Sequence, residues 1–435
     1  MGRYRAPDVY VEEVPSGARP IEAVGASTAA FVGVAPDAEA HVNEPQAINN
    51  PTQFQKEFYP KDKNGNVLEL SVVKDEKGQP VKDADGGLQR RFFEMENGEP
   101  TGNGIPLSDE ALYLSQAVHG FFLNGGSRCY VVNIGASGRI KEGLDQLARI
   151  DEVAIVAAPG RLDAHDDLLT HCEELRDRVA ILDGPESVED LEQLTRVAGG
   201  SKGKDKEPAG LHPRLSRQGY GAFYFPWLVV RDPASTSASD TVKVPPSGHM
   251  AGIWARSEAT RGVHKAPANE PVRGALELSY YLTRAEQEVL NPAGVNCLRW
   301  FSQEGILVWG ARTVAPGASE WRYLNVRRLF NVIEESIARS TRWIVFEPND
   351  YTLWKSIRRD ISAFLTGLWR AGALMGKTPA EAFFVKCDEE TNPQDSIDLG
   401  QVVAIIGIAP VKPAEFVIFR LMQTPTGAKT EVQGG

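Results

Sequence analysis

The sequence contains few cysteines, no long apolar run and no excess of positive charge. Its four cysteines lack the paired spacing of a disulfide framework or a zinc site; they are Cys129, Cys172, Cys297 and Cys387. We expect them to be buried thiols in a reducing compartment. No apolar stretch reaches transmembrane length, and residues 1–7 lack the apolar segment of a signal peptide. We therefore expect no direct membrane insertion and no secretion by a signal peptide.

The balance of charge excludes a further class of protein. The 435 residues include 58 acidic and 47 basic residues, which gives a formal net charge of -11. Non-specific nucleic-acid binding depends on a basic surface, so we expect no nucleic-acid partner. An acidic surface instead favours solubility and contact with the basic patches of a partner protein.

Phosphate-binding glycine motifs are also missing. No G-x-G-x-x-G follows a predicted strand, and the segment Gly376-Lys377-Thr378 lacks the first glycine of a Walker A loop because Ala371 stands there. This segment follows a predicted helix rather than a strand, so it cannot direct its backbone N–H groups at a phosphate as a P-loop does. A helix-cap turn is the better interpretation.

Candidate catalytic and metal-binding groups are isolated from one another. His165 and His171 lie on one predicted helix, but their spacing places them on different faces. The carboxylates of residues 388–390 fit an exposed turn better than an acid–base pair. No G-x-S-x-G or Cys–His nucleophile pattern is present. We predict no catalytic residue, no cofactor and no metal, and thus no enzyme; a nucleotide- or ligand-binding α/β enzyme is the alternative.

The pattern of apolar residues predicts a multi-domain α/β fold. Between residues 108 and 230, predicted strands alternate with predicted helices, which indicates an open, mostly parallel sheet. Residues 40–105 are polar and rich in Asn-Gly and Asp-Gly hairpin signals, which predicts a small β-rich surface insertion. We expect an N-terminal extended arm, an α/β domain, this insertion, a C-terminal α/β domain and a C-terminal strand arm, at residues 1–18, 19–39 with 106–270, 40–105, 271–409 and 410–435.

Both ends of the chain carry strand signals that have no partner nearby in sequence. The last predicted strand is apolar on both faces, which carry in alternation Phe416, Val417, Ile418, Phe419 and Leu421. Such a strand must be covered on both faces, so it must add to the edge of an existing sheet. Near the N-terminus the alternating residues are Val9, Tyr10 and Val11. We expect strand exchange between subunits at these two segments.

A long helix is predicted near residues 350–371. Its apolar stripe consists of Trp354, Ile357, Ile361, Phe364, Leu365 and Leu368. The opposite face carries Lys355, Arg359 and Arg370. This basic face is either an ordinary solvated face or a surface that meets a partner of opposite charge.

A series of short motifs follows in a fixed order along the second half of the chain. They are Val244-Pro-Pro-Ser-Gly, Ala251-Gly-Ile-Trp-Ala-Arg, Arg261-Gly-Val-His-Lys-Ala-Pro-Ala-Asn, Leu290-Asn-Pro-Ala-Gly-Val-Asn, Val308-Trp-Gly-Ala-Arg-Thr, Trp321-Arg-Tyr-Leu-Asn-Val-Arg-Arg-Leu-Phe, Phe346-Glu-Pro-Asn-Asp, Gly372-Ala-Leu-Met-Gly and Ala414-Glu-Phe-Val-Ile-Phe-Arg-Leu. In this order they resemble the sheath protein of contractile phage tails and of phage-tail-like contractile injection systems. The segments Pro7-Asp-Val-Tyr-Val-Glu-Glu-Val and Ala29-Ala-Phe-Val-Gly also look like this family. Residues 40–105 and 199–219 depart from its pattern.

The resemblance implies a structural subunit that polymerises as stacked helical rings around an inner tube and contracts to drive the tube into a target membrane. It implies further contacts with baseplate and terminal cap proteins. It also implies assembly in the cytoplasm, or a place in a virion or an extracellular phage-tail-like particle. The resemblance further implies contact with the tube through the C-terminal domain, which makes Lys355, Arg359 and Arg370 candidate inner-tube contacts. A non-contractile scaffold or capsid-like protein is a third possibility.

Overall fold

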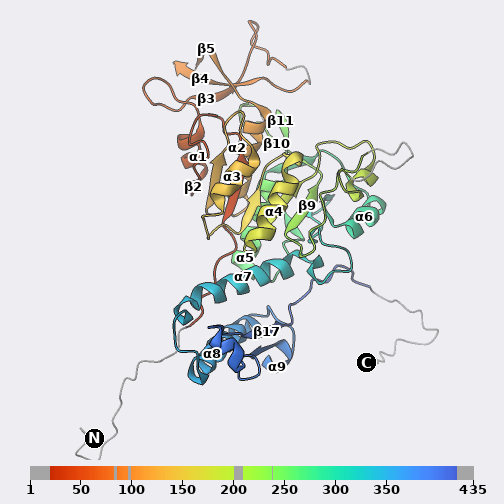
Figure 1. The fold of residues 1–435 in the computed structure, drawn as a ribbon. Helices are drawn as coiled ribbons and strands as arrows, with labels where there is room; N and C mark the ends of the chain where they lie inside the picture. Colours follow the sequence, from red (N-terminus) through yellow and green to blue (C-terminus); the bar gives the residue numbers. More distant parts are fainter. Residues whose placement is uncertain (1–19, 83–85, 97–98, 200–208, 238, 419–435) are drawn as a thin grey trace, which may run out of the picture.

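The computed structural model describes residues 20–82, 86–96, 99–199, 209–237 and 239–418. The chain forms a large upper body built around one mixed sheet and a smaller lower body, with the long helix α7 (Leu324–Ser340) between them (Figure 1). No helix in these ranges is long and apolar enough to cross a membrane. The expected α/β fold class is confirmed.

Five parallel strands form the centre of a nine-stranded sheet, in the order β6, β1, β7, β8, β9. β14 continues this sheet parallel to β9, and antiparallel strands end it: β15 and β12 on one side and β2 on the other. The strands are β1 (Ala29–Gly33), β2 (Gln46–Ile48), β6 (Cys129–Asn133), β7 (Ile155–Ala157), β8 (Val179–Asp183), β9 (Gly221–Phe225), β12 (Glu270–Pro271), β14 (Val295–Phe301) and β15 (Gly305–Val308).

Helices cover both faces of this sheet, which explains why its central strands are continuous apolar runs. Along β1, Phe31 packs on the same side as Phe121 and Trp254, whereas Val32 packs on the side of Leu144. The helices of the upper body are α1 (Pro51–Phe58), α2 (Asp109–Leu123), α3 (Ile140–Leu147), α4 (His165–Leu175), α5 (Ser247–Arg261) and α6 (Arg284–Leu290). All four cysteines are buried free thiols, as expected.

A small β structure projects from the top of the upper body (Figure 1). It consists of β3 (Glu69–Val72), β4 (Arg90–Glu96) and β5 (Glu99–Pro106), and a buried ion pair between Arg90 and Asp232 ties it to the body. Asp232 directly follows β10 (Leu228–Arg231), which forms a second small sheet with β11 (Thr241–Val244) and β13 (Ala275–Leu278).

Two of the expected domain boundaries differ from the structure. Residues 46–58 belong to the main body rather than to the insertion, because β2 pairs with β6, and Phe54 and Phe58 lie in the core. The C-terminal body does not begin at residue 271, because β14 and β15 belong to the nine-stranded sheet. The separate apolar core of the lower body instead begins with α7, since it includes Leu329, Val332 and Ile333 of that helix.

The lower body packs a two-stranded sheet against a long helix. Its elements are α8 (Tyr351–Arg370), α9 (Pro379–Ala382), β16 (Phe383–Lys386), α10 (Gln394–Asp398) and β17 (Ile405–Ile408). The side chain of Asp350 accepts a hydrogen bond from the Leu353 amide at 2.9 Å and so caps α8. Trp354, Ile357 and Ile361 of the predicted apolar stripe lie in the core of this body. The helix predicted near residues 350–371 is therefore confirmed.

Candidate assembly surfaces

The last described residues of the chain form an exposed apolar segment. Phe416, Val417 and Ile418 are 73%, 70% and 78% exposed, and they belong to no strand within the described chain. Phe419 and Leu421, which the sequence assigns to the same strand, lie outside the described residues. Three consecutive large apolar side chains in water are unfavourable unless another molecule covers them.

An ion pair fixes the start of this segment to the upper body. Arg312 donates from Nε to Oε1 of Glu415 at 2.8 Å and from Nη2 to Oε2 at 2.6 Å. Its remaining Nη1 donates to the carbonyl of Asn291 at 2.9 Å. The paired carboxylate raises the pKa of Arg312 above its ordinary value, despite partial burial. We call this pair the Arg312–Glu415 clasp.

A second contact anchors the same segment four residues earlier. Asn325, in the first turn of α7, donates from Nδ2 to the carbonyl of Val411 at 3.0 Å and to that of His264 at 2.8 Å. The amide of Val411 donates in turn to the carbonyl of Ala373 at 3.3 Å. The C-terminal segment is thus held at two points, and it leaves the molecule after Glu415.

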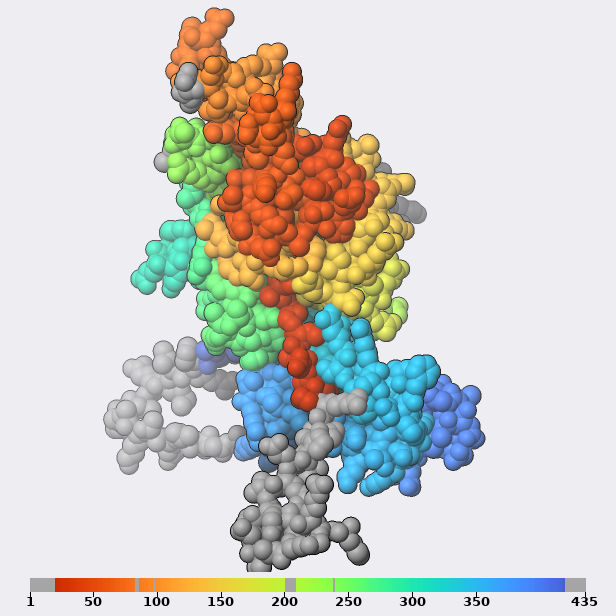
Figure 2. All heavy atoms as spheres, turned by 90° about the vertical axis from the view of Figure 1, so that its left-hand side faces the viewer, coloured from red at the N-terminus to blue at the C-terminus, as the bar shows by residue number. Residues whose placement is uncertain are grey.

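The N-terminal segment is held along the other half of α7. Residues 20–28 run between the two bodies, as the red chain in the middle of Figure 2 shows. The Glu22 amide donates to Oγ of Ser340 at 3.2 Å, and the Val24 amide donates to Oγ of Ser336 at 3.0 Å. The described chain therefore begins near the C-terminal end of α7. Val9, Tyr10 and Val11 lie outside the described residues.

A buried clamp joins this N-terminal segment to α7 and α5. The carboxylate of Glu258 accepts from the Ala26 amide at 2.7 Å and from Nη2 of Arg328 at 2.7 Å. Arg328 also donates to the Ala26 carbonyl at 2.9 Å, and its guanidinium lies 5.2 Å from the ring of Trp254. Burial lowers the pKa of Arg328, and the charge of Glu258 partly offsets this effect. The clamp makes the joint between the upper body and α7 rigid.

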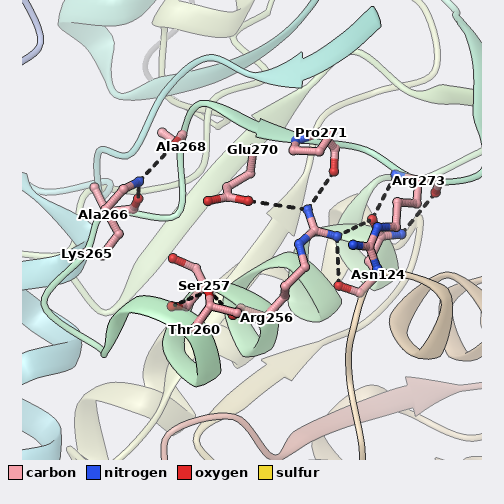
Figure 3. A network of polar contacts seen from close by, with 10 residues as sticks. All are labelled: Asn124, Arg256, Ser257, Thr260, Lys265, Ala266, Ala268, Glu270, Pro271 and Arg273. Carbon is pink, nitrogen blue, oxygen red and sulfur yellow. Dashed lines mark hydrogen bonds and ion pairs between the residues drawn. The ribbon is translucent and has the colours of Figure 1, made fainter. Parts of the chain in front are cut away.

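One end of the large sheet is protected. At this end stands β12, which has only two residues, and one of them is Pro271, which has no N–H to donate. A polar network holds it in place (Figure 3): Arg256 donates to the carbonyls of Asn124 at 3.0 Å and Pro271 at 2.7 Å, and the Arg273 amide donates to Oδ1 of Asn124 at 2.9 Å. In the adjoining loop, Nζ of Lys265 donates to the backbone carbonyls of Ala266 and Ala268. Such an edge does not accept another strand.

The small sheet of the lower body is open by comparison. β16 and β17 pair only with each other among the described strands. Phe383 and Val385 turn toward the core of the lower body, whereas Phe384 and Ile405 on the other face are about half exposed. The chain just after β17 is already paired, because the Met375 amide donates to the carbonyl of Ala409 at 2.8 Å and Leu374 bridges to Pro410. Along β16 and β17 themselves no third described strand is paired, which leaves room for an added strand.

The basic face predicted on α8 is exposed. Lys355, Arg359 and Arg370 all point outward, and Nε of Arg359 donates to the adjacent Asp360 at 2.8 Å. Gly367 lies on the same face, and an added Cβ would meet no atom within 4 Å there. The face thus carries positive charge towards both ends and has no side chain at Gly367 between them. Another protein surface can approach it closely there.

The segments considered for enzymatic chemistry have ordinary structural roles. The backbone amide of Lys377 donates to the carboxylate of Glu381 at 2.7 Å. A carboxylate of the same chain therefore occupies the position after Gly376 that a bound phosphate would take in a P-loop. α9, which follows this turn, has only four residues. Within the described ranges, no group of three or more His, Cys, Asp or Glu side chains could hold a metal ion.

The upper body contains several buried titratable groups. Burial lowers the pKa of His165 and His171 to about 4 and that of His249 to about 3. Burial has the opposite effect on the carboxylic acid Asp183 and raises its pKa to about 6, against the hydrogen bonds donated by Ser247. His165 and His171 are thus core histidines of α4 rather than ligands.

Sequence reasoning missed the residues that hold the two segments. Arg312 and Glu415 are separated by 103 positions, and Arg328 and Glu258 by 70. One signal was available, because Arg312 and Glu415 each stand within a motif that carries the family resemblance. Opposite charges in two such motifs are candidates for an ion pair. Asn325 and Arg328 also stand within one such motif, Trp321-Arg-Tyr-Leu-Asn-Val-Arg-Arg-Leu-Phe, but nothing in the sequence indicates which groups they contact.

These features together describe a structural subunit, with an anchored segment at each end of α7 and a sheet with open edges. Two family models match the chain: "Phage tail sheath protein central domain" over residues 140–314 and "Phage tail sheath C-terminal domain" over residues 318–424. The chain belongs to the contractile tail sheath family, and the resemblance found in the sequence is confirmed.

Individual relatives agree with this assignment. The tail sheath protein of Vibrio phage KVP40 is 31% identical over 188 residues, which are 42% of this chain and 27% of that protein. The chain spans between 27% and 64% of the length of five curated relatives. Two solved structures are each 26% identical to this chain. The sheath complex of the extracellular contractile injection system PVC in its contracted state has a TM-score of 0.68 and covers 98% of this chain and 99% of that one. The contracted helical sheath of the anti-feeding prophage has a TM-score of 0.67 and covers 97% of this chain and 100% of that one.

Proposed function

We propose that this chain polymerises as stacked helical rings around an inner tube and that contraction of these rings drives the tube into a target membrane. The observation that carries the proposal is the exposed segment Phe416–Ile418, fixed to the body by the Arg312–Glu415 clasp, in a chain whose small sheet has open edges. The likeness to two solved sheaths over nearly their whole length supports it. The working assembly needs no nucleotide and no catalytic residue.

The contact between subunits is an added strand. Residues 416–421 of one copy, and residues 9–11 of another, extend the sheet formed by β16 and β17 of a neighbour. Each added main-chain hydrogen bond contributes about 0.5–1.5 kcal/mol net, and several in a row hold a neighbour while its domains rotate. Phe416 and Ile418 cover one face of the sheet and Val417 the other.

The positions at which the two segments leave the molecule favour a helical polymer. They are held near opposite ends of α7, whose 17 residues span about 25 Å at about 1.5 Å per residue. Two segments that leave so far apart reach two different neighbours. A contact of this head-to-tail kind repeats without closing and generates a helix.

The inner tube meets the basic face of α8. Lys355, Arg359 and Arg370 favour an acidic groove on the tube, and the low surface at Gly367 allows close approach. Baseplate and terminal cap proteins bind the two ends of the polymer. The assembly forms in the cytoplasm or is part of a virion or an extracellular phage-tail-like particle.

Electron microscopy and sedimentation of truncated chains test the proposal. Full-length protein should form hollow tubes, whereas chains without residues 1–14 or without residues 414–435 should stay folded and soluble. A third chain without residues 416–435 keeps Glu415 and the clasp, so it separates loss of the strand from loss of the anchor. Normal tubes from all three truncations would contradict strand exchange. Closed shells from the full-length chain would favour a capsid-like protein, and saturable binding of ATP, GTP or NAD in calorimetry would favour the enzyme.

A further inference from the structure

The corner between α7 and α8 contains a backbone turn that its sequence disfavours. Val345 has φ −63° and ψ 124°, Phe346 has φ 71°, and the Glu347 amide donates to the carbonyl of Ile344 at 3.0 Å. These values define a type II turn with Phe346 at its third position. That position requires a positive φ, which glycine and asparagine adopt easily and which an aromatic residue adopts only with strain.

Nothing within the described chain offsets this strain. Phe346 is fully exposed, at 102% relative accessibility. The other described non-glycine residues with positive φ each donate a backbone hydrogen bond or pack a ring; they are His41, Asn43, Arg176 and Asn269. Phe346 makes no such contact, so the subunit alone would be more stable with glycine at this position.

The corner is rigid, so the exposed ring has a defined direction. Asn349 donates from Nδ2 to the carbonyl of Gln401 at 2.9 Å and accepts from Nε1 of Trp354 at 2.8 Å. The cap of Asp350 fixes the start of α8 immediately afterwards. A large apolar side chain on a rigid support loses little conformational freedom on binding, and this is typical of the residues that dominate protein interfaces.

We propose that Phe346 is an interface anchor that inserts into a second copy of this chain. The inference rests on the proposed function, because it takes the partner to be another sheath subunit. The corner follows Ser340, where the N-terminal segment leaves α7, so it borders the proposed strand-exchange surface. Val345 and Tyr351 beside it are also more than half exposed and widen the apolar contact.

The type of side chain favours a second copy over the inner tube. Driving the tube forward requires the sheath to release it, and exposed charges such as Lys355 and Arg359 separate easily because water solvates both partners. A buried aromatic ring releases poorly, because leaving its pocket exposes apolar surface. An aromatic anchor therefore suits a contact between copies that persists through contraction.

The decisive variant is Phe346→Gly, because it should not destabilise the subunit and yet should weaken self-assembly. Removing the strained side chain should leave the thermal midpoint of the subunit unchanged or raised. Loss of the anchor should raise the critical concentration for self-assembly at least about tenfold, a change typical of an interface hot spot. Phe346→Tyr keeps the ring and should assemble nearly as the wild type does. Asn43→Gly is the matched control, since it removes a positive-φ side chain elsewhere and should leave assembly unchanged.

Each outcome of sedimentation and calorimetry is decisive. Wild-type critical concentration for Phe346→Gly, or a lowered thermal midpoint, would overturn the inference. Normal self-assembly combined with failure only in the presence of tubes would assign the anchor to the tube and also overturn it. If the wild-type chain formed no polymer at all, the proposed function would fail together with this inference. If the wild type polymerised and Phe346→Gly did so equally well, only this inference would fail.

Discussion

Neutralising Glu415 should loosen the root of the C-terminal segment without unfolding either body. Arg312 donates two charge-assisted hydrogen bonds to this carboxylate, and the two side chains are only 9% and 17% exposed. In Glu415→Gln the side chain keeps its shape and loses its charge. Hydrogen bonds to charged groups contribute about 1.5–3 kcal/mol and neutral ones about 0.5–1.5 kcal/mol, so the free energy of detaching this segment should fall by about 2 kcal/mol.

Hydrogen exchange at single amides measures this change directly. A loss of about 2 kcal/mol raises the detached population about 30-fold, because about 1.4 kcal/mol corresponds to a factor of ten. The amide of Val411, which donates to the carbonyl of Ala373, should therefore exchange about 30-fold faster. The amide of Ala409 donates to Ala382 at 2.9 Å within the lower body and serves as the internal reference.

A matched variant and two contrary outcomes complete the test of the clasp. Glu389→Gln removes one exposed carboxylate from the lower body, away from the clasp, and should leave the exchange of Val411 unchanged. Unchanged exchange in Glu415→Gln would refute the reasoning that the ion pair holds the segment. Faster exchange throughout both bodies would show instead that Glu415 stabilises the whole fold. Arg312→Lys keeps the charge but loses the two-pronged geometry, so its effect should be intermediate.

Three further predictions concern the joint, the tube and acid. Glu258→Gln leaves the buried Arg328 without its counter-charge and should lower the free energy of unfolding by about 3 kcal/mol in urea titrations. Lys355→Glu with Arg359→Glu should leave the fold intact and reduce co-sedimentation with tubes; wild-type binding would exclude this helix. The buried histidines have folded-state pKa values below the unfolded value near 6.5, so the unfolded chain takes up protons first as the pH falls. Stability should be complete above about pH 7 and decrease from pH 6.5 towards pH 4, by up to about 1.4 kcal/mol per pH unit for each histidine, less the opposite contribution of Asp183; a flat urea midpoint over this range would contradict it.

The elements that the sequence predicts well carry strong local signals. α8 agrees with its predicted bounds because a capping Asp350, a regular apolar stripe and Gly372 mark its start, face and end. The capping box of Thr283 and Glu286 likewise marks the start of α6, and its Thr-x-x-Glu pattern can be read directly from the sequence. Propensity, pattern and capping agree at these places, so local reasoning is sufficient.

The sheet membership of short strands cannot be predicted locally, because it depends on contacts distant in sequence. β2 has only three residues, and nothing in Gln46–Ile48 indicates that it pairs with β6 at the edge of the main sheet. The polar composition of the neighbouring insertion dominates that region, so the whole of residues 40–105 was predicted as one unit. Similarly, β14 and β15 form a hairpin of neighbouring strands, but their membership of the nine-stranded sheet depends on the pairing of β14 with the distant β9.

Phe346 shows a different limit of sequence reasoning. Turn propensities place glycine or asparagine at the third position of a type II turn, so a phenylalanine there argues against the very turn that forms. Local rules fail where an interaction outside the subunit has selected the residue. The exposed residues Phe416–Ile418 are a related case, since their strand pattern is clear and the strand partner is absent from the described chain.

The contrast between the two sheets is the physical argument for our proposal that assembly proceeds through the lower body. An open sheet edge in water invites uncontrolled association, and soluble proteins usually block it. This chain blocks the β12 end of its large sheet with Pro271 and the network around Arg256, whereas β16 and β17 pair only with each other among the described strands. The same chain carries an apolar strand sequence that is anchored at Glu415 and pairs with no sheet edge among the described residues. Donor and acceptor surfaces on different parts of one chain pair between copies in a single direction, and a contact of that kind extends into a helix.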